Sequence, residues 1–237
     1  MTAPVLNAFT VDLEGWYQSS LPDPAAPPLE AQRDGIRAGI GTLMEILGKR
    51  GVSATWFTLG TVADLLPSEL RGIVQAGHEI ASHGHAHDDV DALGPEGFGK
   101  DLARAEEALH AACGVRPRGY RSPKWSAGRA GPWYFETLAR RGYVYDSSLN
   151  PVPFLGTRGM RHDAHRIAGV AELPPMAVRT IVGWLPGGGS LGLRNLTHRV
   201  IARRVAALNA AGEPAVFWVH PWELSPGRLH GRLPLAT

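Results

Sequence analysis

Short apolar runs alternate with stretches of helical periodicity along the chain. The predicted strands are residues 6–11, 54–59, 78–82, 118–121, 143–145 and 215–219. The predicted helices are residues 30–50, 95–112, 132–141 and 196–211. A further helical stretch leads to Gly77. In the first helix, Ile36, Ile40 and Leu43 recur at helical spacing, and Gly51 ends it. Repeated strand–helix units predict a parallel sheet covered by helices, as a barrel or as an open doubly wound sheet.

Two segments rich in Pro or Gly interrupt this pattern. Residues 21–28 are interpreted as a loop, and residues 151–192 give no clear periodicity. We find neither a low-complexity linker nor an internal repeat, and therefore predict a single catalytic domain over residues 1–237. The run Asp12-Leu13-Glu14-Gly15-Trp16 follows the first strand where a nucleotide-binding fold would carry a Gly-rich phosphate fingerprint, which argues against such a fold.

The composition narrows the class of protein. The chain has 237 residues, 44% hydrophobic and 19% charged, which is typical of a globular protein with a full-sized core. The net charge is +2 and the basic residues are scattered, so we expect no nucleic-acid partner. The single cysteine, Cys113, excludes an internal disulfide and a multi-cysteine metal site, and is interpreted as a small buried hydrophobe. We recognise neither a signal peptide nor a membrane span, and expect a cytoplasmic protein.

The first polar cluster is Asp12 and Glu14, directly after the first predicted strand. Two carboxylates two residues apart can point toward one site, one as a metal ligand and the other as a general base. Taken alone, the pair is more typical of loop carboxylates that cap a helix or face solvent. In a parallel barrel, however, the carboxyl ends of the strands share one face, and such enzymes place their sites there.

The second cluster is the run Ser82-His83-Gly84-His85-Ala86-His87. A turn that brings His83 and His87 to one side would join two imidazoles with a carboxylate, a natural ligand set for zinc. The ligand types fit cobalt, nickel or iron as well. The alternative is a His-rich surface loop, and we interpret His85 as an incidental histidine of that kind.

Two further clusters are weaker. Arg121 ends a strand ahead of Pro123 and could orient a carboxylate through paired hydrogen bonds, or form an ordinary surface ion pair. His220 ends a very apolar strand between two tryptophans, where it is either a core residue or a general acid. Asp146 could orient His220 or cap a turn.

In this order, the clusters resemble the NodB-type polysaccharide deacetylases (carbohydrate esterase family 4). Members carry an acidic motif after the first strand, then His-x-x-x-His, Arg-x-Pro, an Asp motif and a late histidine, and all five occur here between Asp12 and His220. The Asp-x-Glu, Asp-Ser-Ser and His-Pro-Trp-Glu runs look like the exopolysaccharide-locus (XrtA-associated) and peptidoglycan-deacetylase-like subgroup. The resemblance implies an α/β fold, a distorted (β/α) barrel with about seven strands.

The resemblance also implies roles for individual residues. Its metal ligands are Glu14, His83 and His87. Its catalytic residues are Asp12 as base, Arg121 to orient Asp12, His220 as general acid and Asp146 to hold His220. Its substrate subsite includes Lys124, Trp125 and Trp222, with a backbone N–H near Lys124 as oxyanion donor. The implied activity is metal-dependent removal of N-acetyl groups from N-acetylhexosamine units of a glycan or glycan precursor, with zinc as the expected ion.

This chain departs from the family pattern at two positions. Gly15 stands where the subgroup often has another acidic residue, and Lys124 stands where many relatives have an aromatic. The chain also ends soon after His220, which leaves open whether a second copy in a homo-oligomer completes the saccharide groove. One alternative function is hydrolysis of a small cyclic imide or ureide-like amide on the same fold. A second alternative is a saccharide-binding module without activity, against which the intact set of acid, base and ligands argues.

Overall fold

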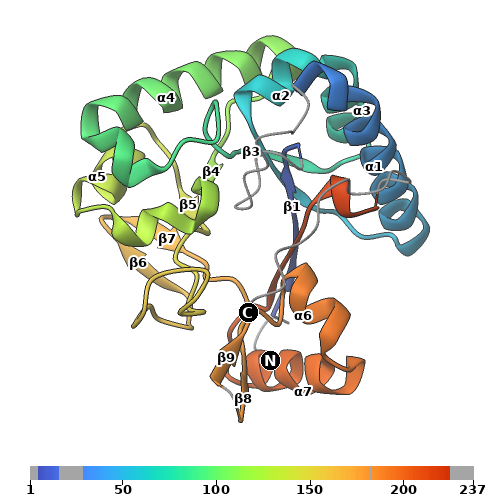
Figure 1. Ribbon diagram of the computed structural model, residues 1–237, viewed down its shortest axis with the longest axis vertical. Helices are drawn as coiled ribbons and strands as arrows, with labels where there is room; N and C mark the ends of the chain where they lie inside the picture. Colours follow the sequence, from blue (N-terminus) through green and yellow to red (C-terminus); the bar gives the residue numbers. More distant parts are fainter. Residues whose placement is uncertain (1–4, 16–28, 182, 225–237) are drawn as a thin grey trace, which may run out of the picture.

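An eight-stranded sheet organises residues 5–15, 29–181 and 183–224, the part of the chain that this computed structural model describes (Figure 1). Its strand order is β10-β1-β2-β3-β4-β5-β7-β6. The strands are β1 (Ala8–Leu13), β2 (Thr55–Thr58), β3 (Glu79–Ser82), β4 (Gly119–Tyr120), β5 (Tyr145–Asp146), β6 (His165–Ile167), β7 (Val170–Glu172) and β10 (Val216–Val219). All neighbours from β10 to β7 are parallel, and only β6 runs antiparallel. The sheet curls into a half-barrel, which confirms the predicted α/β fold.

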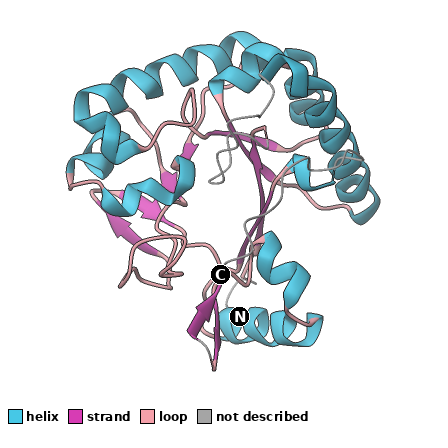
Figure 2. Ribbon diagram, viewed as in Figure 1, coloured by secondary structure: helices cyan, strands magenta, loops and turns pink. Residues whose placement is uncertain are grey.

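Helices cover the convex side of the curled sheet (Figure 2). They are α1 (Leu29–Arg50), α2 (Gly60–Leu65), α3 (Pro67–Gln75), α4 (Val90–Cys113) and α5 (Trp133–Arg140). A smaller lobe combines the hairpin β8 (Val178–Thr180) and β9 (Gly183–Leu185) with α6 (Ser190–Asn195) and α7 (His198–Ala210). Two 3₁₀ segments, η2 (Pro123–Arg129) and η3 (Pro221–Leu224), follow β4 and β10.

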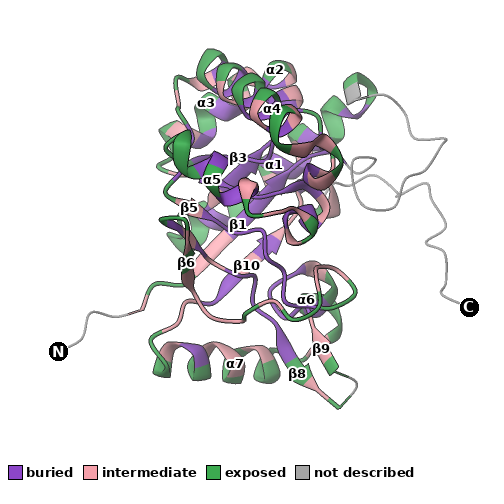
Figure 3. Ribbon diagram, turned by 90° about the vertical axis from the view of Figure 1, so that its left-hand side faces the viewer, coloured by how far each residue is buried: buried purple, intermediate pink, exposed green. Residues whose placement is uncertain are grey.

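The alternation of side chains along β1 assigns its two faces. Val11 and Leu13 are fully buried in the core cluster that the apolar stripe of α1 completes. Successive side chains of a strand point to opposite faces, so Thr10 and Asp12 project from the other face, toward the concave side of the sheet. Figure 3 shows buried strands beneath helices whose outer faces are exposed. The hydrophobic pattern thereby directs the polar residues of β1 to one side.

The predicted elements differ from the structure mainly after residue 113. The region 151–192 holds β6, β7, β8, β9 and the start of α6, none of which the pattern predicted. The predicted helix 196–211 is α7, with α6 as a separate helix before it. Helix α4 begins at Val90, earlier than predicted, and bends where Gly94 has a φ of 66°. Strands of two or three residues are too short to show a period, and their pairing comes from distant partners.

Cys113 lies half-buried at the end of α4. Its Sγ donates to the carbonyl of Leu109, and burial raises the pKa of the thiol. This agrees with a packing role. Among the described residues, none of the helices is both long and apolar enough to cross a bilayer. The loop predicted at residues 21–28 lies outside the described residues.

Candidate metal and acid–base site

The polar residues gather at the carboxyl edge of the sheet because each one directly follows a parallel strand. Glu14 follows β1, His83 follows β3, Arg121 follows β4 and His220 follows β10. Strand β1 pairs with β10 on one side and β2 on the other, and β3 pairs with β2 and β4. The next residue of each strand therefore emerges at one edge, where parallel α/β folds place their sites.

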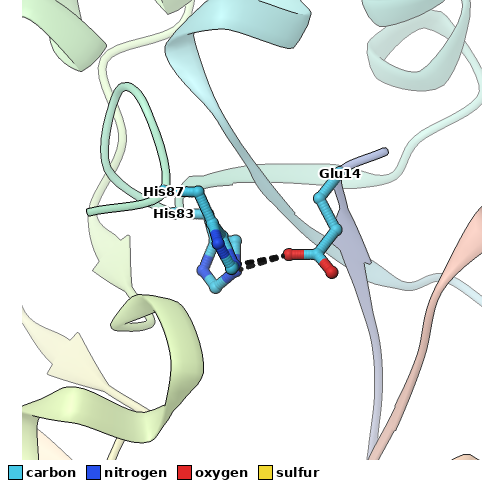
Figure 4. A group of neighbouring side chains, drawn as sticks. All are labelled: Glu14, His83 and His87. Carbon is cyan, nitrogen blue, oxygen red and sulfur yellow. Dashed lines mark ion pairs between the residues drawn. The ribbon is translucent and has the colours of Figure 1, made fainter. Parts of the chain in front are cut away.

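Glu14, His83 and His87 form a compact donor set (Figure 4). The Glu14 Oε2 lies 2.7 Å from His87 Nε2 and 3.5 Å from His83 Nε2. All three residues are buried, and one ligand atom from each lies within 4.8 Å of the others. His83 Nδ1 lies 2.8 Å from the carbonyl oxygen of Arg121, so a proton on Nδ1 leaves the Nε2 lone pair directed at Glu14. This donor set fits a divalent ion with open coordination positions.

Backbone strain at His87 and charges around Glu14 both affect the donor set. His87 has a φ of 67°, an uncommon conformation for a residue with a side chain. Burial by itself raises the pKa of Glu14, but the charge of His87 and hydrogen bonds from His83 and His87 outweigh it and hold that pKa well below its usual value. Glu14 is therefore a carboxylate, which is the form that binds cations.

Asp12 and Arg121 form a buried ion pair beside the donor set. Arg121 Nη1 lies 2.7 Å from Asp12 Oδ1, and the Arg121 side chain is fully buried. The same Nη1 donates to Thr10 Oγ1, while Nε and Nη2 donate to the carbonyl and Oγ of Ser147 at 3.0 and 2.8 Å. The guanidinium lies 4.2 Å from the ring centre of Phe57. These contacts fix the guanidinium, and with it the orientation of Asp12.

His220 directs one ring nitrogen toward the donor set and the other toward Glu223. Its Nε2 lies 3.6 Å from Glu14 Oε1, and its Nδ1 lies 3.5 Å from Glu223 Oε1. The ring stacks on Trp222, with a centroid distance of 4.9 Å. Burial lowers the pKa of His220, but the hydrogen bond of Glu223 and the charges of Glu14, Glu223 and Asp12 raise it to about 9. The surrounding carboxylates thus favour the protonated form of the ring.

Asp146 requires a correction, because the structure does not bring it to His220. Its Oδ1 accepts hydrogen bonds from Tyr134 Oη and Ser148 Oγ at 2.9 and 2.6 Å. It lies on β5 in register with Glu172 of β7, and the two buried carboxyl groups hydrogen bond to each other. Within the described residues, the carboxylate that contacts the imidazole of His220 from its Nδ1 side is Glu223. The contacts of Asp146 instead come from α5, from β7 and from its own turn.

The three predicted substrate residues follow β4 and β10 at the carboxyl edge of the sheet, and each has different contacts. Lys124 forms an ion pair with Asp89 at 2.9 Å, and Trp125 is buried with its ring 5.2 Å from that of Trp218. Both Lys124 and Trp125 have positive φ angles, 52° and 55°, so the chain turns sharply after β4. Trp222 is half-buried against His220.

His85 is not the surface residue that the sequence indicated. Its side chain is buried, its backbone N–H lies 3.1 Å from both carboxylate oxygens of Asp101, and burial lowers the pKa of its ring. It therefore supports the turn that carries His83 and His87.

Three site residues were missed by the sequence analysis: Thr10, Ser147 and Glu223. Ser147 stands inside the Asp-Ser-Ser run, and Glu223 follows His220 by three residues. Both were therefore visible in motifs already singled out. Their partners were not visible, because Ser147 contacts Arg121 from another strand and the pairing of Glu223 depends on the turn of η3.

Comparisons with known proteins find similarity in two segments of the chain. A family model described as polysaccharide deacetylase matches residues 34–130, and a model described as a domain of unknown function (DUF3473) matches residues 147–235. A peptidoglycan deacetylase-like protein from Gibberella zeae is 34% identical over 116 residues, 48% of this chain and 33% of that protein. A peptidoglycan deacetylase from Helicobacter pylori is 28% identical over 152 residues, 63% of this chain and 51% of that protein. The chain thus spans about half the length of these relatives or less.

A solved structure supports the fold. A Mycobacterium smegmatis protein described as a polysaccharide deacetylase superposes with a TM-score of 0.65 at 23% identity, covering 93% of this chain and 81% of that one. Residues 34–130 are thus similar to the polysaccharide deacetylase family, and the fold agrees with that of NodB-type proteins of carbohydrate esterase family 4. Membership in the exopolysaccharide-locus subgroup stays a prediction.

Proposed function

We propose that this protein is a metal-dependent deacetylase that hydrolyses the N-acetyl amide of N-acetylhexosamine units in a glycan or glycan precursor. The observation that carries the proposal is the single edge at which a buried Glu14–His83–His87 set adjoins an Arg-bound carboxylate and the ring of His220. The similarity to peptidoglycan deacetylases supports the substrate class.

Glu14, His83 and His87 would hold the ion. An ion bound there supplies a Lewis acid that polarises the amide carbonyl and lowers the pKa of a water molecule. Two imidazoles and a carboxylate favour zinc, and also suit cobalt, nickel or iron. The hydrogen bond between His83 and the Arg121 carbonyl orients this ligand before any ion binds.

Asp12 is the general base in this proposal. Arg121 binds its Oδ1, which holds the carboxylate in one orientation and leaves Oδ2 to accept the proton of the attacking water. Thr10 and Ser147 hold Arg121, and Arg121 holds Asp12. The carboxylate that takes the water proton therefore has a fixed position.

His220 is the general acid. Its Nε2 lies 3.6 Å from Glu14 Oε1, and a proton on that nitrogen can pass to the departing amine as the C–N bond breaks. The sharp turn at Lys124 and Trp125 brings backbone N–H groups to this edge, where one of them would stabilise the oxyanion. Trp222 offers a half-buried ring for a sugar beside His220.

The test is acetate release from N-acetylglucosamine oligomers by metal-free protein, measured before and after addition of zinc, cobalt, nickel or iron. A cyclic imide is supplied in parallel, since ring opening without acetate release would support the alternative function instead. His87→Ala should lose bound metal and turnover, while His198→Ala, which changes an exposed histidine of α7, should keep both. Absence of both metal binding and hydrolysis in the unaltered protein would favour a module without activity.

A further inference from the structure

We infer that Glu223 is the positioning residue of the general acid, and that the segment matched by the domain of unknown function contributes a His220–Glu223 pair to the site. This inference rests on the proposed function. Residues 147–235 contain both His220 and Glu223, whereas the deacetylase model ends at residue 130. The segment thus has a chemical role, because it supplies the proton donor and fixes its orientation.

The two carboxylate oxygens of Glu223 lie near two different nitrogens of His220. Oε2 accepts the backbone N–H of His220 at 3.0 Å, and Oε1 lies 3.5 Å from the ring Nδ1. The two residues are three apart because η3 turns the chain directly after β10. With Nδ1 facing Glu223, the opposite nitrogen Nε2 faces Glu14 and the site. A flip of the ring would move Nδ1 away from Oε1, so the negative charge of Glu223 favours one orientation of the ring.

A Gly-rich turn places a second support behind this carboxylate. The Oγ of Ser190, at the start of α6, donates to Glu223 Oε2. The preceding turn packs closely on β10, since Trp218 donates its backbone N–H to the Gly188 carbonyl oxygen at 2.8 Å. A Cβ on Gly188 would lie 2.3 Å from the Val216 carbonyl oxygen, and one on Gly189 would lie 2.3 Å from the Trp218 ring. Glycine is required for this approach, and the approach brings Ser190 to Glu223.

The other buried acids near the sheet are bound elsewhere. Asp146 is bound by Tyr134 and Ser148, Glu172 accepts the backbone N–H of Leu149, and Asp12 is bound by Arg121. Among the described residues, Glu223 is therefore the acid available to orient Nδ1. A proton then leaves His220 Nε2 for the amine nitrogen as the C–N bond breaks, while the Nδ1 proton stays directed at Glu223.

The test is Glu223→Gln, which keeps the size of the side chain but removes the negative charge that faces Nδ1 of His220. With an N-acetylglucosamine oligomer, whose amine must be protonated to leave, kcat should fall about 100-fold, as for loss of general acid catalysis, with KM little changed. With 4-nitrophenyl acetate, whose leaving group needs no proton, kcat should change little. Glu136→Gln, an exposed carboxylate of α5, is the matched control and should alter neither.

A double substitution separates positioning from a merely structural role. In a His220→Ala background, Glu223→Gln should cause no further loss, because the ring it orients is gone. An equal loss in both backgrounds, or equal losses on the amide and the ester, would overturn the inference.

NMR of ¹⁵N-labelled histidine measures the environment of the His220 ring nitrogens in the absence of substrate. The Nδ1 signal of His220 should shift in Glu223→Gln and stay in place in Glu136→Gln. If the unaltered protein hydrolyses no acetamide but this shift occurs, the proposed function fails and the positioning stands. An unmoved Nδ1 signal would refute the positioning whatever the activity.

Discussion

Asp12 illustrates how the surroundings of a short side chain restrict it to one orientation. Side chains alternate between the two faces of β1. Val11 and Leu13 face the core, so Asp12 faces the concave side of the sheet. Its orientation depends on Arg121, which is fully buried and shares its donors among Asp12, Thr10 and Ser147. A buried guanidinium bound on several sides moves little, so the carboxylate that it binds is held in one orientation.

The residue-scale prediction concerns Asp12→Asn. The amide retains an oxygen acceptor for Arg121, so the fold and metal content should persist, while kcat should fall by about 10²–10⁴-fold because the general base is lost. Metal analysis and acetate release measure the two effects. Near-normal turnover would reduce Asp12 to a structural partner of Arg121, and loss of metal would mean that it also organises the ligands.

At the scale of elements, the pair Asp146–Glu172 ties β5 to β7. Both residues are fully buried in register, and Glu172 also accepts the backbone N–H of Leu149 at 3.0 Å. Burial and the neighbouring charge of Asp146 raise the pKa of Glu172 well above its usual value. Two such carboxyls hydrogen bond only while they share a proton, so this contact depends on pH.

Glu172→Gln should remove that dependence. A raised folded-state pKa means that the native state holds a proton that the unfolded chain releases, so stability falls as pH rises from the ordinary Glu pKa toward the raised value. The slope for one proton is about 1.4 kcal/mol per pH unit. Denaturant unfolding between pH 5 and pH 8 should show the variant gaining stability relative to the unaltered protein as pH rises. A constant difference would mean that the pair holds no extra proton.

The glycines of two elements make a matched test of packing. Gly41 lies exposed in α1, where an added Cβ meets nothing within 4 Å, so Gly41→Ala should stabilise the protein by roughly 0.5–1 kcal/mol. Gly189→Ala places its Cβ 2.3 Å from the Trp218 ring and should destabilise by about 1–3 kcal/mol. Urea unfolding measures both, and a stabilising Gly189→Ala would show that the turn can move away from β10.

At the scale of the whole molecule, the site is assembled by one sheet from segments far apart in the chain. The matched deacetylase segment supplies β2, β3 and β4, while the later segment adds β7 beside β5 and β10 beside β1. Glu14 and His87 lie far apart in the sequence yet have atoms 2.7 Å apart. Binding of an ion therefore cross-links β1 to the turn after β3.

This arrangement predicts that metal stabilises the folded state as a whole. A ligand that binds only the native protein adds about 2.7 kcal/mol at a concentration 100 times its dissociation constant. Zinc should therefore raise the thermal unfolding midpoint of the unaltered protein but not that of His83→Ala. An equal rise in both would place the ion elsewhere, for example on exposed histidines such as His198.

The sequence by itself determined the α/β class, the main strands and the residues that stand at strand ends. Those signals are local: apolar runs predict strands, helical spacing predicts helices, and a motif order from Asp12 to His220 indicates the family. Only the tertiary structure decided which carboxylate meets His220, because the motif order indicated Asp146 and no local pattern records the contact of Glu223. Asp146 on β5 is bound by Tyr134 and Ser148, whereas the turn of η3 folds Glu223 back toward the ring of His220. The short strands between residues 165 and 185 likewise exist only through pairing, which no local period records.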